Sequence, residues 1–231
     1  MKQVYIVTCT KVKTKEEFAK RPLGKSLSKL EKIYSSNQLS YTVVYNNKEG
    51  LSAVYNRFLN NVEHEDKIIV FCHDDLILDT IFLCEHLNKS PYAVTGLAGA
   101  CIFKNESNVP PAWHLMTERD SWFGEVKHIK DGVIFTTQFG KTIGRVKVID
   151  GLFIAVDVNK IINTKARFNE TYEFHHYDLA FCMECLKENI TVGVMPINVI
   201  HYGLGDSMLT RDWEESARKF SNEYSNFSKY N

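Results

Sequence analysis

Strand-length apolar segments alternate with segments of helical periodicity through the first hundred residues, and this alternation is the strongest constraint on the fold. Residues 67–72 are almost wholly apolar, as expected of a parallel strand that is buried on both faces. Residues 51–62 carry apolar side chains at helical spacing. The alternation predicts an α/β fold with a mostly parallel, Rossmann-like central sheet and helices on both faces. The other elements expected in this half are strands at residues 4–9, 41–45 and 92–103 and helices at residues 27–34 and 79–87, the last capped by Asp79.

The second half of the chain has a different pattern. Residues 104–125 are polar and predict a loop, and residues 211–224 predict an amphipathic helix at the end of the chain. No linker, repeat or low-complexity segment divides the sequence, so we expect one domain over residues 1–231. The remaining elements expected here are strands at residues 133–137, 145–149, 151–156 and 191–201 and a helix at residues 177–188.

The charge balance argues against a nucleic-acid partner. Lysine plus arginine equals aspartate plus glutamate at 28 each, whereas nucleic-acid binders usually carry a basic excess or a basic face. The one basic stretch, residues 11–32, is expected to be a solvated helix and loop or to contact an anionic ligand or a membrane surface. A peripheral membrane contact therefore stays among the alternatives.

Targeting signals and cysteines point to a cytoplasmic protein. The first residues turn polar too soon for a signal peptide, and no run reaches the roughly 18 apolar residues of a membrane span. The six cysteines are scattered, as expected of reduced thiols rather than a disulfide framework. Cys182 and Cys185 form a lone CxxC within an expected helix, where core thiols are the expected role.

The most informative local feature is the end of the apolar strand at residues 67–72, which is followed by His73, Asp74 and Asp75. Two adjacent carboxylates repel each other unless a cation or a hydrogen-bond network holds them. Mg²⁺ and Mn²⁺ prefer carboxylate oxygens, and Mg²⁺ commonly binds one or two carboxylates together with substrate phosphates. The alternative is that the two acids cap the following turn.

An ordered set of segments resembles the family-2-like glycosyltransferases of the GT-A fold, in particular a subgroup of short, single-domain bacterial members. Each segment is weak alone, but their order and spacing over most of residues 4–220 make the set specific. The resemblance divides the domain into a nucleotide-sugar-binding half at residues 1–103 and an acceptor and catalytic half at residues 104–231. Segments that carry it are NNKEGL at 46–51, IVFCHDD at 69–75, VIDGLFIA at 148–155 and FHHYDLAF at 174–181.

The resemblance implies roles for the acidic and histidine residues. His73-Asp74-Asp75 stands where the family keeps its Asp-x-Asp-type signature, so Asp75 is the implied metal ligand, and Asp74 is implied to ligate the metal or to contact the donor ribose. Asp178 matches the catalytic base of inverting members, although an acid at a helix start is also favoured by the helix dipole. His201 matches a further metal or diphosphate ligand, or is a structural residue at a strand end.

The remaining implied residues contact the substrates. Asp150 would hydrogen-bond hydroxyls of the donor or acceptor, and Trp113 and Trp122 would stack on a sugar or anchor the core. The chain has no GxGxxG and no Walker A sequence, so dinucleotide and P-loop sites are excluded. The residues implied at the nucleotide are Thr8, Thr10, Asn46 and Asn56.

The function expected is transfer of a sugar from a nucleotide-diphosphate donor, UDP-linked by the resemblance, to the hydroxyl of a carbohydrate or other acceptor. Inversion at the anomeric carbon and dependence on Mn²⁺ or Mg²⁺ are implied with it. One alternative is a non-catalytic nucleotide-sugar-binding protein. The other is a nucleotidyltransferase of related fold, although the Gly-rich loop of those enzymes is missing after the first strand, where the sequence reads TCTKVK.

Overall fold

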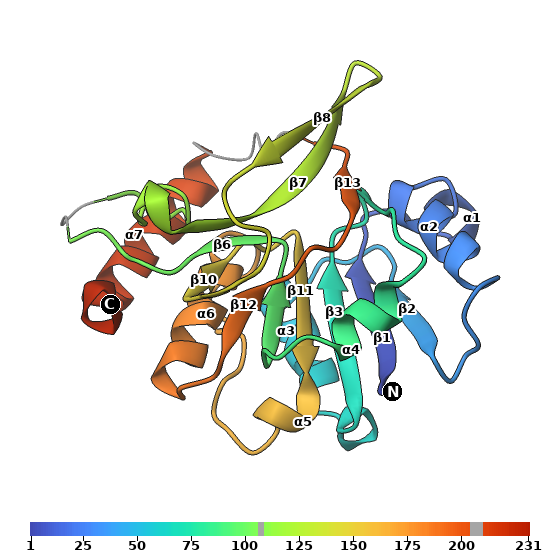
Figure 1. Cartoon of the computed structure of the whole chain (residues 1–231), viewed down its shortest axis with the longest axis horizontal. Helices are drawn as coiled ribbons and strands as arrows, with labels where there is room; N and C mark the ends of the chain where they lie inside the picture. Colours follow the sequence, from blue (N-terminus) through green and yellow to red (C-terminus); the bar gives the residue numbers. More distant parts are fainter. Residues whose placement is uncertain (106–108, 204–209) are drawn as a thin grey trace.

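The computed structural model describes residues 1–105, 109–203 and 210–231, which form two β-sheets with helices around them (Figure 1). The larger sheet has the strand order β2-β1-β3-β11-β5-β12-β9. Five of its strands run in one direction, whereas β11 and β9 run antiparallel to their neighbours. The predicted mostly parallel sheet is therefore confirmed, with one antiparallel strand near its middle. The strands are β1 (Gln3–Cys9), β2 (Leu39–Val44), β3 (Lys67–Cys72), β5 (Val94–Gly96), β9 (Gly144–Val146), β11 (Phe153–Asp157) and β12 (Val192–Val194).

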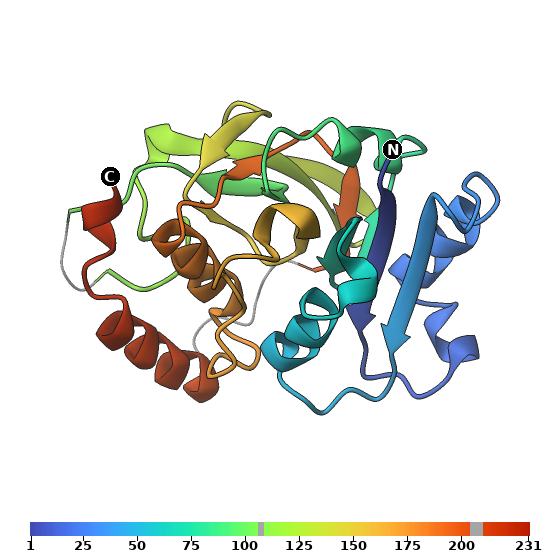
Figure 2. The same cartoon turned by 90° about the horizontal axis from the view of Figure 1, so that it is seen from below.

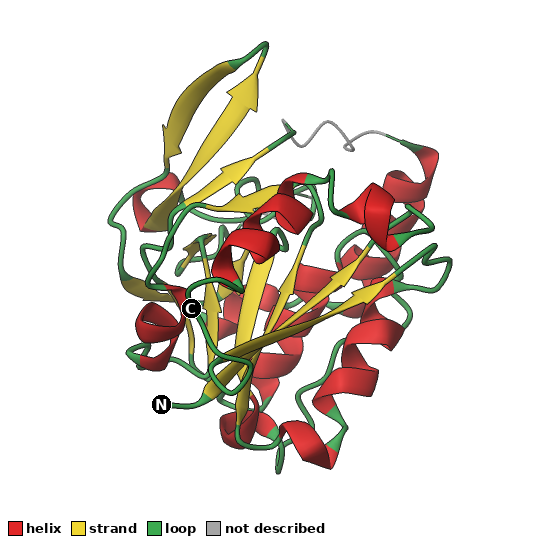
Figure 3. Cartoon of the chain, turned by 90° about the vertical axis from the view of Figure 1, so that its right-hand side faces the viewer, coloured by secondary structure: helices red, strands yellow, loops and turns green. Residues whose placement is uncertain are grey.

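The smaller sheet has the order β10-β6-β7-β13-β4, and β8 extends it by pairing with β7. In Figure 1 this sheet stands above the carboxyl ends of β1 and β3. Its β7–β8 hairpin turns at Asp131 and Gly132, which both have positive φ, as a two-residue hairpin turn requires. Figure 3 shows the hairpin projecting from the body of the molecule. The strands are β4 (Leu76–Leu78), β6 (Ala98–Ala100), β7 (Trp122–Lys130), β8 (Val133–Gln138), β10 (Val148–Ile149) and β13 (Val199–His201).

Several single strands predicted from the sequence are pairs of short strands that belong to different sheets. Residues 92–103 divide at Leu97 into β5 and β6, and residues 191–201 divide into β12 and β13. Residues 145–149 likewise divide into β9 and β10. Gly99 in β6 lets β10 approach closely, since a Cβ at this position would lie 2.1 Å from the Val148 carbonyl oxygen.

Two predictions of local structure are wrong. Residues 104–125 were expected to be a loop, yet Trp122 begins the long strand β7. The helix expected at residues 79–87 begins later, at α4 (Leu83–Asn88), and Phe82 rather than Asp79 is at its N-cap. Asp79 instead donates its backbone N–H to the Asn198 carbonyl oxygen beside β4. Local polarity and spacing alone did not show that residues 76–78 and 122–130 pair with strands distant in the sequence.

Helices cover the larger sheet on both faces, as predicted. Figure 2 shows α3, α6 and α7 on one side of the sheet and α4 on the other, the side that also carries the smaller sheet. The side chains of Cys182 and Cys185 are buried in α6, and all six cysteines are free thiols, which agrees with the sequence. No helix of the described chain is long and apolar enough to cross a membrane. The helices are α1 (Lys15–Phe18), α2 (Pro22–Leu30), α3 (Leu51–Leu59), α4, α5 (Val158–Ile161), α6 (Tyr177–Lys187) and α7 (Arg211–Glu223).

Candidate active site

Three of the predicted site residues, Asp74, Asp75 and Asp150, lie where the chain passes between the two sheets. His73, Asp74 and Asp75 form the whole connection from β3 in the larger sheet to β4 in the smaller one. Asp150 and Gly151 lie on the return connection from β10 to β11. This edge of the larger sheet is at the carboxyl ends of its parallel strands, where ligands bind in open α/β sheets.

The two adjacent carboxylates have different partners. Asp74 accepts two hydrogen bonds from Arg21, at 3.0 Å from Nε and 2.8 Å from Nη2, and a third from Thr10 Oγ1 at 2.5 Å. The Arg21 guanidinium and the Thr10 hydroxyl stabilise the charge of Asp74 without a metal ion, so the structure does not pair Asp74 with Asp75 as two metal ligands. The metal role that the sequence left open for Asp74 is therefore not supported by its contacts.

Asp75 faces two histidines instead. The side chains of His73, Asp75 and His201 each place one potential ligand atom within 4.8 Å of the others, so this group could hold a metal ion. Asp75 Oδ2 lies 3.5 Å from His201 Nε2, and Asp75 Oδ1 is buried without a hydrogen-bond partner among the described residues. Burial raises the pKa of Asp75, but the hydrogen bond from His201 and the nearby His73 lower it by more, so the net pKa is below its usual value.

Hydrogen bonds also determine which nitrogen of His73 can bind a metal. The Tyr177 hydroxyl donates to the Gly151 carbonyl oxygen at 2.7 Å, and it lies 3.2 Å from His73 Nε2. Since the single hydroxyl proton is used on Gly151, the Tyr177 oxygen accepts the proton of His73 Nε2. The lone pair of His73 is then on Nδ1, and a hydrogen bond of this kind is typical of histidine ligands.

The residues present fit a divalent cation. They supply two imidazoles and one carboxylate, and within residues 1–105, 109–203 and 210–231 the buried Oδ1 of Asp75 has no hydrogen-bond partner. Imidazole ligands suit transition-metal ions such as Zn²⁺, whereas the carboxylate suits Mn²⁺ and Mg²⁺, so this group fits a divalent cation without selecting one.

Two cavities meet at His73. The first, of about 520 Å³, lies between the ends of β1 and β3 and the start of α3. Its lining includes three cationic side chains, Lys11, Arg21 and Lys48, together with Thr10 and Asp75. The basic stretch at residues 11–32 thus contributes both helical surface and cavity lining, and its contact with an anionic ligand or a membrane surface stays a prediction.

The second cavity, of about 540 Å³, lies under the β7–β8 hairpin and contains Asp150 and Asp178. Asp150 Oδ2 accepts a hydrogen bond from Trp113 Nε1 at 3.1 Å, and Asp150 Oδ1 accepts one from the Leu152 backbone N–H at 2.9 Å. Trp113 is itself buried, so it both anchors the core and lines the cavity. His73 and Phe174 line both cavities, so the cation group and Asp178 stand on neighbouring walls.

Asp178 has the chemistry of a base that works near neutral pH. Burial and, next, the charge of Asp150 raise its pKa to about 7, while backbone N–H groups including that of Leu179 lower it by less. The sequence argument expected the helix start to favour the charged form. That expectation is wrong, because burial raises the pKa of Asp178 by more than the N–H groups of the first turn lower it. A raised pKa near the working pH is what general-base catalysis requires.

A match over nearly the whole chain follows this geometry: residues 10–224 fit the family described as "Glycosyltransferase like family". The chain belongs to this glycosyltransferase-like family. The family, together with the two-sheet α/β architecture, confirms the predicted GT-A-like fold and makes the protein a transferase. No curated protein matches the chain by sequence.

Solved structures similar to this glycosyltransferase-like protein share little sequence with it. A197 from STIV is 13% identical over 87% of this chain and 86% of its own, with a TM-score of 0.46. S. aureus TarS 1-349 is 12% identical over 87% of this chain and 60% of its own, with a TM-score of 0.44. The inositol-1-phosphate CTP transferase from T. maritima is 11% identical over 95% of this chain and 96% of its own, with a TM-score of 0.42.

Three of the residues implied at the nucleotide lie outside the walls described for either cavity of the glycosyltransferase-like chain. Thr8 is fully buried in β1, and Asn46 lies in the turn after β2 with a positive φ of 47°. The amide of Asn56 is engaged by Phe168 and Glu170, with three hydrogen bonds of 2.8 to 2.9 Å. Thr10 does line the first cavity. Donor contacts by Thr8, Asn46 and Asn56 therefore stay predictions, and the contacts of Asn56 are those of a structural residue.

Sequence reasoning did not name Arg21, Tyr177, or His73 as a candidate metal ligand. The signal for His73 was present, since it adjoins the two acids at a strand end. No local pattern marks Arg21, which is 53 positions from its partner Asp74.

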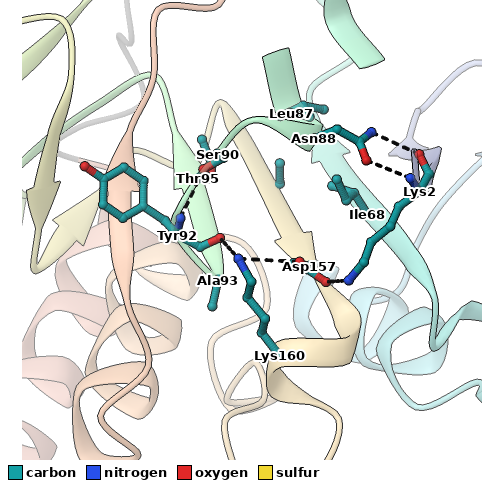
Figure 4. Close-up of a pocket in the computed structure, with 11 residues that line it drawn as sticks. Lys2, Ile68, Leu87, Asn88, Ser90, Tyr92, Ala93, Thr95, Asp157 and Lys160 are labelled. Carbon is teal, nitrogen blue, oxygen red and sulfur yellow. Dashed lines mark hydrogen bonds and ion pairs between the residues drawn. The ribbon is translucent and has the colours of Figure 1, made fainter. Parts of the chain in front are cut away.

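A third, small cavity of about 100 Å³ lies at the opposite end of the larger sheet (Figure 4). Its charged groups pair with one another: Asp157 is 2.5 Å from Lys2 Nζ and 3.6 Å from Lys160 Nζ. These contacts connect the start of β1 to the end of β11. In the glycosyltransferase-like protein, the ion pair of Lys2 with Asp157 therefore bridges β1 and β11 across β3, at the end of the sheet opposite the candidate active site.

Proposed function

We propose that the protein transfers a sugar from a nucleoside diphosphate donor, UDP-linked, to an acceptor hydroxyl with inversion. The observation that carries this proposal is the pair of cavities that meet at His73, with the candidate cation group at the boundary and Asp178 in the second cavity. A donor in the first cavity and an acceptor in the second would then meet beside the cation group. Such placement of two reactants is the main requirement for a displacement reaction.

The first cavity suits the nucleotide part of the donor. Lys11 and Lys48 place ammonium groups around a space large enough for a nucleotide, and Arg21 is held at its wall by Asp74. These cations would attract a diphosphate. Thr10 and Asp74 lie beside Arg21 and are the residues we assign to the ribose side.

The second cavity holds the proton acceptor. Asp178 would take the proton of the acceptor hydroxyl while the acceptor oxygen bonds to the anomeric carbon and the bond from that carbon to the diphosphate oxygen breaks. The electron pair of the broken bond leaves with the diphosphate. A divalent cation held by His73, Asp75 and His201 would neutralise this developing charge. Asp150, held by Trp113 and Leu152, would accept hydrogen bonds from sugar hydroxyls.

Thermal unfolding in the presence of UDP and Mn²⁺ tests the donor and cation assignments together. A ligand that binds only the folded state raises its stability by mass action. We expect UDP with Mn²⁺ to raise the melting temperature, and Asp75→Ala to abolish the Mn²⁺-dependent part of that rise. Asp66→Ala, an exposed acid just before the same strand β3, is the matched control and should keep the full response.

An Asp75→Ala protein with an unchanged Mn²⁺ response would remove Asp75 from the cation group. Release of UDP from a UDP-sugar, measured with acceptor mixtures, separates a transferase from a protein that only binds the nucleotide. Binding of UDP without turnover on any acceptor would favour the non-catalytic alternative.

A further inference from the structure

The second cavity differs from the first in its charged side chains. Among the described residues that line it there is no lysine and no arginine, whereas Lys11, Arg21 and Lys48 line the first cavity. The segments 106–108 and 204–209, which lie outside the described chain, contain neither residue type in their sequence. Two carboxylates, Asp150 and Asp178, face into the second cavity.

Three of the histidines that line it, His114, His175 and His176, do not replace the missing cations at neutral pH. Burial lowers the pKa of His114 and of His175, and burial together with His175 lowers the pKa of His176 to about 4. These three rings are therefore neutral at pH 7. An anionic group in this cavity would lose water and face two carboxylates without a cation of the protein to pair with.

Aromatic rings make up much of the remaining wall. Trp113, Trp122 and Phe139 contact one another with ring centroids 5.0 to 6.2 Å apart. On the hairpin side, Phe135 stacks on His128 at 5.4 Å, and His128 lines the cavity. Aromatic faces bind the C–H surfaces of sugar rings, and a few fixed carboxylates orient the hydroxyls.

We propose that the acceptor seated in the second cavity is a neutral saccharide, one that carries no phosphate or carboxylate on the sugar bound there. This inference rests on the proposed function, because it takes the second cavity as the acceptor site. The hairpin contributes to the selection through Val126 and Thr137, which line the cavity from β7 and β8.

The hairpin also supplies a matched pair of variants. Thr137 points into the second cavity, and its neighbour Thr136 lies on the opposite face of the same strand and is exposed. Thr137→Lys adds a cation to the cavity, whereas Thr136→Lys adds the same charge outside it. Neither residue belongs to the proposed catalytic or cation groups.

The test is a binding titration by isothermal calorimetry with UDP and Mn²⁺ present, so that the charge of the cation is already paired with the diphosphate. The probes are glucose, galactose and N-acetylglucosamine, each compared with its 6-phosphate, and glucose also with glucuronic acid. We expect at least one neutral sugar to bind at least tenfold more tightly than its anionic counterparts. Thr137→Lys should lower the ratio of neutral-sugar affinity to anionic-sugar affinity at least tenfold, and Thr136→Lys should leave this ratio unchanged.

Equal or tighter binding of an anionic sugar by the unmodified protein would overturn the proposal, as would binding of no neutral sugar. An identical effect of the two lysine variants would show that the cavity does not make the selection, and would also overturn it. The UDP and Mn²⁺ melting response is recorded on the same samples. Its loss would count against the proposed function, whereas its retention with a reversed sugar preference would count against the neutral acceptor alone.

Discussion

Replacing Asp178 with asparagine is expected to make the protein more stable and less active at the same time. The pKa of Asp178 is raised from 3.8 to about 7 by burial and by Asp150. Between pH 4 and pH 7 the folded state holds a proton that the unfolded state releases, so the free energy of unfolding falls as pH rises through this range. Above pH 7 the folded protein bears the whole penalty of a charged, buried carboxylate.

The size of this penalty follows from the shift. A pKa difference of one corresponds to 1.36 kcal/mol, so the rise of the Asp178 pKa from 3.8 to about 7 corresponds to a penalty of about 4 kcal/mol as an upper limit. Because the carboxylate borders a cavity, we expect solvent screening to reduce it to about 2 kcal/mol. Asparagine keeps an oxygen for the Leu179 N–H and carries no charge, so Asp178→Asn should recover this energy. For a chain of this length, 2 kcal/mol raises the melting temperature by about 4–8 °C.

The assay is urea or thermal unfolding of both proteins in EDTA, at pH 8 and at pH 4.5. The stabilisation by Asp178→Asn should be about 2 kcal/mol at pH 8 and much smaller at pH 4.5, and it should vanish only well below pH 3.8, where both states of the natural protein hold the proton. Asp66→Asn, at an exposed position, should change stability at neither pH. A variant that is not stabilised at pH 8, or is stabilised equally at both pH values, would refute the electrostatic reasoning.

The same variant tests the catalytic role. Transfer to the acceptor should fall at least ~10²-fold, the lower end for loss of a general base, while the UDP and Mn²⁺ melting response stays intact. In the natural protein, kcat/KM should fall tenfold per pH unit below an apparent pKa of about 7. Undiminished transfer by Asp178→Asn would remove Asp178 as the base, whatever its effect on stability.

Two further variants separate structural from substrate-binding roles. Asn56→Ala removes three hydrogen bonds to Phe168 and Glu170, so it should lower the free energy of unfolding by ~2–4 kcal/mol, as measured by urea unfolding. Its affinity for UDP, measured by calorimetry, should be unchanged. A variant that is as stable as the natural protein but binds UDP more weakly would return Asn56 to the donor site. Gly151→Ala places a Cβ 2.6 Å from the Tyr177 hydroxyl and 3.0 Å from Asp178 Oδ2, so the Asp178 carboxylate should be displaced. We expect kcat to fall at least tenfold and the KM for the donor to change less. An unchanged kcat would show that the second cavity tolerates the added methyl group.

The sequence predicted the layout of the fold because hydrophobic period and strand length determine which residues are buried. The strands at residues 4–9 and 67–72 and the helix at the end of the chain were located correctly. The direction of β11 and the division of residues 92–103 into β5 and β6 were not predicted. An apolar strand has the same pattern whether its neighbours run parallel or antiparallel, and a change of sheet needs only one residue such as Leu97.

The candidate site was predicted to a similar extent. Asp75, Asp178, Asp150 and His201 were named from the family resemblance, and the structure places them around two neighbouring cavities. The partners that give these acids different chemistry were not visible. Arg21 makes Asp74 a paired anion, and burial beside Asp150 gives Asp178 a raised pKa. Both effects depend on distances between residues that are far apart in sequence.

The two sheets explain how such distant residues come together. The chain passes from the larger to the smaller sheet at residues 73–75 and from the smaller to the larger at residues 150–152, so His73, Asp75 and Asp150 lie on covalent connections between the sheets. His201 ends β13 and Asp178 lies in the first turn of α6. Tyr177 joins these connections, since its hydroxyl donates to the Gly151 carbonyl oxygen and accepts from His73. Tyr177 is also adjacent to Asp178 at the start of α6. The separation between the proposed base and the candidate cation group is therefore held by backbone connections and one buried tyrosine. Flexible surface side chains have little part in it, as a site that aligns two substrates requires.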